Sequence, residues 1–204
     1  MGVVIKGIGM SAILDTGEKT RSWGEAARAF MHPKVISMLF LGFSAGVPIL
    51  LIFSTLSVWL READVARSTI GFFSWAALGY GFKVVWAPLV DKLPLPILSK
   101  LMGRRRSWLL FSQALVISAM CAMAFNDPVV SLSAVAIGAV MLGFSSATQD
   151  IVIDAYRIES ATKELQGLMS ATYVAGYRIG MVVAGAGALE MAGMLDVIDG
   201  YDYG

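Results

Sequence analysis

Cysteine and histidine are almost absent from the chain, which has one of each, Cys121 and His32, in 204 residues. A single cysteine excludes an internal disulfide, and the two residues together cannot build a His/Cys metal site. The sequence also contains no G-x-S-x-G nucleophile motif and no Gly-rich phosphate-binding loop. We therefore expect no cofactor, no metal site and no catalytic residue, and a membrane enzyme is the least favoured class.

Charge is also scarce. Charged residues make up 15% of the chain, against roughly 25% in soluble domains, while 57% of the residues are hydrophobic. The mean hydropathy is +0.71. A net charge of +1 gives no general attraction to nucleic acid, so nucleic acid is not an expected partner. The composition predicts an all-α, polytopic transmembrane helical bundle whose surroundings are the lipid bilayer.

Long apolar runs predict five transmembrane helices within residues 35–189. Residues 1–34 are predicted to be a cytoplasmic segment, in which residues 23–31 favour either a helix on the membrane surface or a loosely ordered tail. Pro48 predicts a kink in the first span. Residues 155–167 read as a mixed-charge loop, and residues 190–204 as an acidic periplasmic tail. The expected spans are about residues 35–60, 69–90, 108–125, 129–153 and 168–189.

The basic residues are distributed unevenly over the predicted loops. Of the 16 Lys and Arg residues, twelve fall on one side of the membrane, and two, Arg61 and Arg67, on the other. The remaining two, Lys83 and Arg178, lie within spans. The positive-inside rule therefore predicts a cytoplasmic N-terminus.

Five is an unusual number of spans for a transporter. Many secondary transporters pair inverted three-helix repeats, so a half of such a protein has six helices. We therefore expect the chain to be the truncated N-terminal part of a transporter, with five spans of an incomplete half. A non-transporting membrane subunit is the alternative from a different class.

Two cations lie deep within the predicted spans. Arg178 is ten residues into the fifth span, about 15 Å deep, and Lys83 is roughly 10 Å from one end of the second span. A charge near the bilayer centre costs at least ~2.5–3.5 kcal/mol, so it is either functional or paired. The two cations suit an anionic substrate, and the alternative is a structural ion pair of one of them with Asp150. Gly176 and Gly180 flank Arg178 in a small-xxx-small pattern that lets a neighbouring helix approach.

A charged stripe ends the fourth predicted span. Asp150 and Asp154 are four residues apart and Arg157 follows three residues later, so all three share one face of a helix. Such a stripe marks either the water interface or a gate or proton site in a transporter. Asp150 is the residue nearer the membrane interior, and it could carry a proton if desolvation raises its pKa.

Several segments resemble known transporters. The pairing of Asp91-Lys92 with a later Gly-Arg-Arg-Arg run at residues 103–106 resembles the signature loop of the major facilitator superfamily, with a longer, proline-containing insert between its two parts. Further runs resemble the AmpG-type muropeptide permeases of that superfamily and follow one another in order along the chain. They comprise residues 42–48, 55–60, 80–91, 146–157 and 176–180.

This resemblance implies an inner-membrane permease of twelve or more helices. Such permeases import anhydro-muropeptides, the disaccharide-peptide fragments of the cell wall, in wall recycling. The resemblance implies proton symport, multi-pass placement in the bacterial inner membrane, and a C-terminal transporter half as partner. The same family includes acetyl-CoA transporters, whose substrate is also anionic, so another anionic-solute transporter is the alternative.

Roles for individual residues follow from the resemblance together with the residue chemistry. Lys83 and Arg178 are expected to bind substrate carboxylates, while Gln149 and Tyr177 hydrogen-bond sugar or peptide. Asp150, with Asp154, is expected to carry the proton. The basic cluster is also a topology determinant, and both roles can hold. The expected cytoplasmic gate consists of Asp91, Lys92, Gly103, Arg104, Arg105, Arg106 and Arg157.

Overall fold

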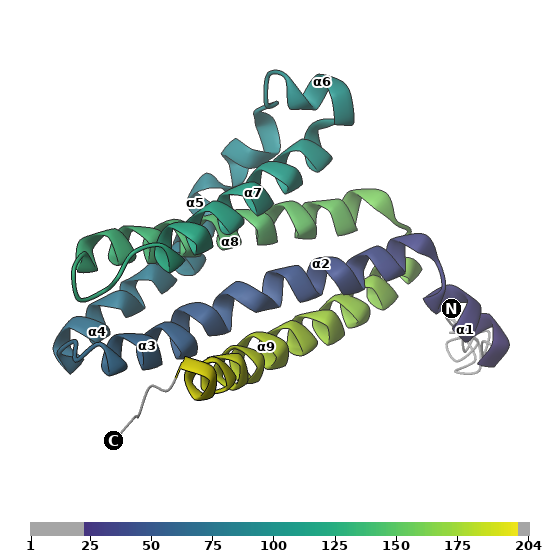
Figure 1. The fold of residues 1–204 in the computed structure, drawn as a ribbon. Helices are drawn as coiled ribbons and strands as arrows, with labels where there is room; N and C mark the ends of the chain where they lie inside the picture. The colour runs from purple at the N-terminus through teal and green to yellow at the C-terminus, as the bar shows by residue number, and fades with distance from the viewer. Residues whose placement is uncertain (1–22, 200–204) are drawn as a thin grey trace, which may run out of the picture.

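The computed structural model describes residues 23–199, and this part of the chain folds into helices joined by turns, without a strand (Figure 1). The all-α fold class expected from the sequence is thus confirmed. Residues 1–22 and 200–204 lie outside the described residues, and with them most of the expected cytoplasmic segment and the end of the expected acidic tail. Residues 23–30, for which the sequence left helix and tail open, form helix α1 (Trp23–Phe30).

The first long helix changes its hydrogen-bond pattern part-way along. Helix α2 (Pro33–Leu50) begins with proline at a position where no N–H is needed, and contains Pro48 near its end. A π-helical turn, η2 (Leu51–Thr55), follows and leads into α3 (Leu56–Glu62). Because Pro48 has no N–H to donate, the series of backbone hydrogen bonds along α2 is interrupted just before this π-helical turn.

The second expected span is not one continuous helix. It consists of α4 (Arg67–Phe73), a 3₁₀ turn η3 (Ser74–Ala77) and α5 (Leu78–Lys92). The 3₁₀ turn has the sequence Ser-Trp-Ala-Ala, with no glycine or proline, so neither hydropathy nor a helix-breaking residue predicts it. A short helix, α6 (Leu98–Met102), then leads through Gly103, with φ of +81°, into α7 (Arg104–Ala124). Glycine fits this turn because L side chains rarely adopt positive φ.

The two C-terminal helices are longer than expected. Helix α8 runs from Leu132 to Ser160, and α9 from Lys163 to Asp199. The expected loop at residues 155–167 is therefore mostly helix, and α9 continues through residues 190–199 of the expected tail. Mixed charge suggested a loop, but Arg157 pairs with Asp154 at 3.0 Å, and i,i+3 ion pairs of this kind support a helix.

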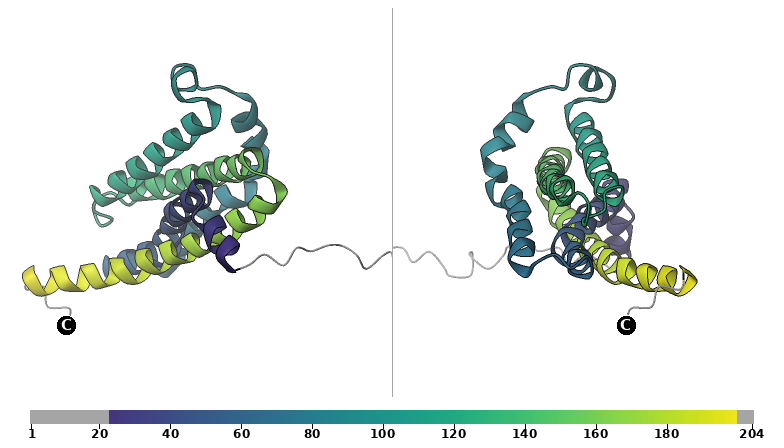
Figure 2. Two further views of the ribbon diagram at one scale, coloured as in Figure 1. Left: turned by 90° about the vertical axis from the view of Figure 1, so that its right-hand side faces the viewer. Right: turned by 60° about the vertical axis from the view of Figure 1, so that its left-hand side comes forward.

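Helix α8 is the centre of the bundle. It lies between α5 and α7, while α2 and α9 run side by side in the same direction as a parallel pair (Figures 1 and 2). Each of the three hydrophobic clusters contains residues of α8: Leu142 packs with α3 and α7, Ile153 with α2 and α9, and Val152 with α5 and α7. The buried side chains of α8 are thus packed against helices on several sides.

Four glycines bring the backbones of α2 and α9 into direct contact. A Cβ on any of them would fall on a backbone carbonyl oxygen of the opposite helix. The pattern is reciprocal, two glycines four residues apart on each helix, and it lets Tyr173 and Tyr177 of α9 approach α2 closely. The glycines are Gly42, Gly46, Gly176 and Gly180.

Three helical segments of the described chain are long and apolar enough to cross a membrane: Pro33–Glu62, Arg104–Ala124 and Leu132–Ser160. They correspond to the first, third and fourth expected spans. The division into five spans remains a prediction for the segments of α4–α5 and α9.

Candidate functional site

A run of polar side chains is buried in the middle of α8. Ser145, Ser146, Thr148 and Gln149 are each at most 3% exposed, and Asp150 follows them directly. Buried polar groups carry a desolvation cost that partners must offset, so their partners on neighbouring helices define a site.

Asp150 is held by two helices. Its carboxylate lies 3.9 Å from Nζ of Lys83 on α5, and accepts a hydrogen bond of 3.1 Å from the Tyr173 hydroxyl on α9. The side chain of Asp150 is 15% exposed and that of Lys83 is 35% exposed. The ion pair that the sequence left as an alternative for Lys83 is therefore present, and Lys83 still has accessible surface for a further anionic partner.

Gln149 and Thr148 connect α8 to two further partners. The Gln149 amide donates from Nε2 to the Ser44 hydroxyl of α2 at 3.1 Å. The indole Nε1 of Trp86 on α5 donates to Thr148 Oγ1 at 3.2 Å, and the Trp86 ring packs on Phe144 with centroids 4.6 Å apart. The Trp86 contacts fix α5 against α8 within one turn of Lys83, and the Gln149 hydrogen bond joins α8 to α2.

Two tyrosines complete the surroundings of Asp150. Tyr177 lies with its ring centroid 6.0 Å from that of Tyr173, and Tyr80 of α5 lies near Ser146 and Asp150. We call this set the polar cluster, and it draws on α2, α5, α8 and α9. It consists of Ser44, Tyr80, Lys83, Ser146, Gln149, Asp150, Tyr173 and Tyr177.

Arg178 does not join the polar cluster. It is exposed on another face of α9, beside Ile179, Val182 and Val183. Successive residues of a helix point about 100° apart, so Arg178 and Tyr177 face different surroundings. Of the four residues expected to bind substrate, the structure brings together Lys83, Gln149 and Tyr177.

A second charged centre joins the end of α5 to the ends of α7 and α8. Arg105 contacts Asp91 Oδ1 at 2.6 Å and donates from Nε to Glu159 Oε2 at 2.9 Å, with a second contact to Oε1 of the same carboxylate. Arg104 lies 3.9 Å from Glu159. We call Asp91, Arg104, Arg105 and Glu159 the ion-pair network. A guanidinium that bridges two carboxylates from different helices fixes their relative position.

The remaining expected gate residues lie outside this network. Asp154 and Arg157 pair with each other within α8. Gly103 supplies the turn before α7, and Lys92 is exposed at the end of α5. The charged stripe on α8 is therefore divided: Asp150 faces α5 and α9, while Asp154 and Arg157 satisfy one another.

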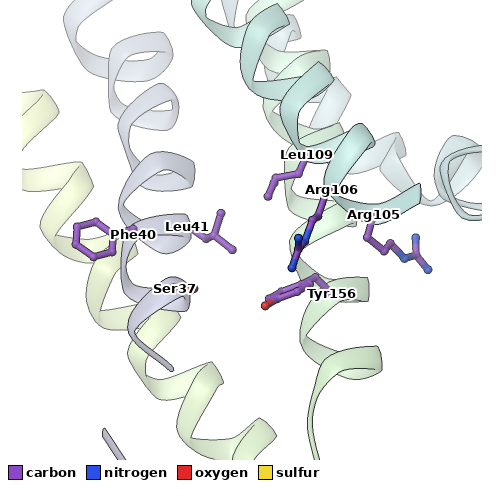
Figure 3. A pocket seen from close by; sticks show the side chains of 7 residues that line it. All are labelled: Ser37, Phe40, Leu41, Arg105, Arg106, Leu109 and Tyr156. Atoms are coloured by element: carbon purple, nitrogen blue, oxygen red, sulfur yellow. The ribbon is translucent and has the colours of Figure 1, made fainter. Parts of the chain in front are cut away.

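A pocket of about 380 Å³ lies beside the ion-pair network, between α2, α7 and α8. Figure 3 shows Arg106 extending towards Tyr156, while the guanidinium of Arg105 turns away from the pocket. Most of its wall is apolar, and it does not include the polar cluster. The lining residues are Ser37, Phe40, Leu41, Arg105, Arg106, Leu109 and Tyr156.

Sequence reasoning missed half of the polar cluster and one member of the ion-pair network. Tyr80 precedes Lys83 by three residues, Ser146 precedes Asp150 by four and Tyr173 precedes Tyr177 by four, so helical spacing could have found them. Ser44 and Glu159 carry no such signal. Each is recognised by a contact across the bundle with Gln149 or Arg105.

Comparison with known proteins identifies the family. The family model described as acetyl-coenzyme A transporter 1 matches residues 34–199, which is most of the chain. The chain belongs to this transporter family. It is therefore a multi-pass helical membrane protein, and the polar cluster and the ion-pair network both lie within the matched region.

The similar proteins include AmpG-type permeases, as the resemblance implied. A Rickettsia felis protein named AmpG 4 is 43% identical over 165 residues, which is 81% of this chain and 40% of that protein. The anhydromuropeptide permease of Escherichia coli K12 is 41% identical over 165 residues, which is 81% of this chain and 33% of that protein. This chain thus spans at most two fifths of the length of these two relatives. No solved structure gives a significant match.

Proposed function

We propose that this chain supplies part of a secondary transporter that imports anhydro-muropeptides across the bacterial inner membrane. The observation that carries the proposal is the polar cluster, a buried charged site where four helices meet, in a chain 41% identical to an anhydromuropeptide permease. A charged site kept inside a membrane bundle is a feature of substrate and proton pathways.

In this proposal Lys83 binds a substrate carboxylate, because about a third of its side chain is still exposed beside Asp150. Gln149 and Tyr177 hydrogen-bond the uncharged parts of the substrate. Asp150 carries the coupled proton, with Asp154 as a second candidate outside the cluster. Arg178 is a further candidate for the substrate carboxylates, acting from another face of α9.

The ion-pair network acts as the cytoplasmic gate in this proposal. Arg105 connects the end of α5 to the end of α8, so breaking its contacts would let these helix ends separate. Lys92, Gly103, Arg106 and Arg157 flank the network. The substrate reaches the cluster by alternating access between two transporter halves, with the N-terminus of this chain in the cytoplasm.

Transport of acetyl-CoA is the second candidate, and the name of the matching family model favours it. Acetyl-CoA carries phosphates, which Lys83 would bind as readily as carboxylates. The two substrates are separated by competition, because an acetyl-CoA transporter is inhibited by unlabelled acetyl-CoA and a muropeptide permease by unlabelled muropeptide.

Uptake of labelled anhydro-muropeptide into cells that lack their own permease tests the proposal. The chain is expressed alone and as a chimaera in which it replaces the matched segment of the E. coli permease. We expect uptake by the chimaera, and its loss in Lys83→Ala and Arg178→Ala with membrane insertion intact. Normal uptake by both variants would remove the assignment of the two cations.

Lys83→Ala also leaves the Asp150 carboxylate without its cation, which lowers stability. The double variant Lys83→Ala/Asp150→Asn removes both charges and controls for this. We expect it to regain thermal stability but not uptake. Recovery of uptake in the double variant would mean that the pair is structural.

A further inference from the structure

Unpaired polar atoms gather in the polar cluster. Within residues 23–199, six buried side-chain polar atoms have no hydrogen-bond partner. Three of them belong to the cluster: the Tyr80 hydroxyl, Ser146 Oγ and Gln149 Oε1. The other three are on Thr55, Ser99 and Ser160, each on a different element. Since an unpaired buried polar atom costs about 1–3 kcal/mol, three in one place call for a partner from outside the chain.

The three atoms lie on two helices that pack against each other, α5 and α8. Ser146 and Gln149 are three residues apart on α8, and both share a helix face with Asp150. The Tyr80 hydroxyl lies beside Ser146, and neither of these hydroxyls makes a hydrogen bond of normal geometry. Tyr80 precedes Lys83 by three residues on α5. Gln149 is fully buried and Ser146 is 2% exposed, so bulk water does not satisfy them.

The chemistry of these atoms defines what binds there. Gln149 uses one end of its amide on Ser44, and whichever way the amide is turned, its other end is unpaired. The two hydroxyls can each donate and accept. None of the three groups is charged, and together they can donate and accept hydrogen bonds, which matches a neutral group that does both, such as a hydroxyl or an acetamido group. The charged groups Lys83 and Asp150 lie directly beside them.

We propose that Tyr80, Ser146 and Gln149 form a sugar subsite, which binds the hydroxyl or acetamido groups of the substrate's disaccharide while Lys83 binds the carboxylate of its peptide. This rests on the proposed muropeptide transport. The aromatic rings of Tyr173 and Tyr177 on the adjacent helix supply apolar faces of the kind that sugar rings pack against.

Two conservative variants remove one hydroxyl each, Tyr80→Phe and Ser146→Ala. Ser145→Ala is the matched control, because Ser145 is equally buried on the same helix but already donates to the Met141 carbonyl at 2.6 Å. Deleting a hydroxyl that has no partner in the protein leaves the fold as stable as before or more stable. Loss of binding without loss of thermal stability therefore separates a ligand contact from a structural one.

The readout is competition against uptake of labelled muropeptide by the chimaera. The competitors are the disaccharide without its peptide and the peptide without its disaccharide. For Tyr80→Phe and Ser146→Ala we expect the inhibitory concentration of the disaccharide to rise about 3- to 10-fold, as for loss of one neutral hydrogen bond. We expect the inhibitory concentration of the peptide to stay unchanged in these two variants. Ser145→Ala is expected to change neither inhibitory concentration.

Unchanged inhibition by the disaccharide, or weaker inhibition by the peptide, would overturn the sugar subsite. So would a lower Tm of the two variants with normal inhibition, which would mark sites of internal water. If the unsubstituted chimaera takes up no muropeptide, the proposed function fails by itself. Direct binding of the disaccharide to the purified chimaera then decides the subsite: weaker binding in Ser146→Ala than in Ser145→Ala supports it, and equal or absent binding rejects it.

Discussion

At the residue scale, neighbouring charges in this chain are in very different surroundings. Asp150 is surrounded by α5 and α9, whereas Asp154, one turn along α8, pairs with Arg157 in the same helix. In the same way, Arg105 bridges Asp91 and Glu159 while Arg106 extends into a largely apolar pocket (Figure 3). Residue type and spacing alone do not distinguish the members of these pairs.

This difference predicts unequal effects of the same substitution. Arg105→Lys retains the charge but loses the planar guanidinium that contacts both oxygens of Glu159 together with Asp91. Loss of charge-assisted hydrogen bonds of about 1.5–3 kcal/mol corresponds to roughly a tenfold or larger loss of uptake by the chimaera. Arg106→Lys keeps uptake near the unsubstituted level, because Arg106 lies outside the network. Equal effects of the two substitutions would refute the special position of Arg105.

At the scale of the helices, the contact between α2 and α9 depends on four glycines, which have no side chain to keep the two backbones apart. The four glycines let the backbones meet, which places Tyr173 within hydrogen-bond distance of Asp150. Helix association in membranes depends on such close packing because lipid provides no hydrophobic driving force. The polar cluster is therefore sensitive to substitutions where α2 and α9 meet, at residues outside the cluster itself.

Gly176→Ala is expected to lower the unfolding free energy in detergent by about 1–3 kcal/mol, since its Cβ would meet the Leu39 carbonyl and force the helices apart. Gly193→Ala on the same helix meets nothing within 4 Å. It is expected to be neutral or to stabilise by about 0.5–1 kcal/mol, because alanine is the better helix former. Circular-dichroism melts of both variants check this, and a stable Gly176→Ala would show that the helices do not meet through their backbones.

At the scale of the whole molecule, the distribution of basic residues predicts the orientation of the bundle. Residues 92–106, which include α6 and the adjoining ends of α5 and α7, carry five of the basic residues and are expected to face the cytoplasm, while the turn between α7 and α8 is expected to face the periplasm. Both connections are exposed at Lys100 and Val129, respectively. A topology experiment can thus read both sides of the membrane.

The measurement uses single cysteines in a Cys121→Ser background. A membrane-impermeant thiol reagent applied to spheroplasts, whose outer membrane is removed, is expected to label Val129→Cys but not Lys100→Cys. Lysis of the cells makes both positions reactive. Labelling of Lys100→Cys in intact spheroplasts would invert the proposed orientation and place the ion-pair network on the periplasmic side.

The sequence by itself determined the fold class, the apolar segments and the positions of the unusual charges. Hydropathy and the scarcity of charge require an all-helical membrane bundle, because backbone groups in lipid must be satisfied within each segment. The sequence also singled out Lys83, Gln149, Asp150 and Tyr177 from their depth and from the family resemblance.

Only the tertiary structure decided which of these residues meet. Lys83 and Asp150 are 67 positions apart, and their contact depends on how α5 packs on α8. The sequence predicts Arg178 and Lys83 both to lie within spans, yet the rotation of α9, set by its glycines against α2, points Arg178 away from the polar cluster. Helical spacing relates Tyr80, Ser146 and Tyr173 to residues that the sequence singled out, but Ser44 is recognised only by its contact across the bundle. The packing of the whole bundle sets the rotation of each helix and therefore decides which of these side chains meet.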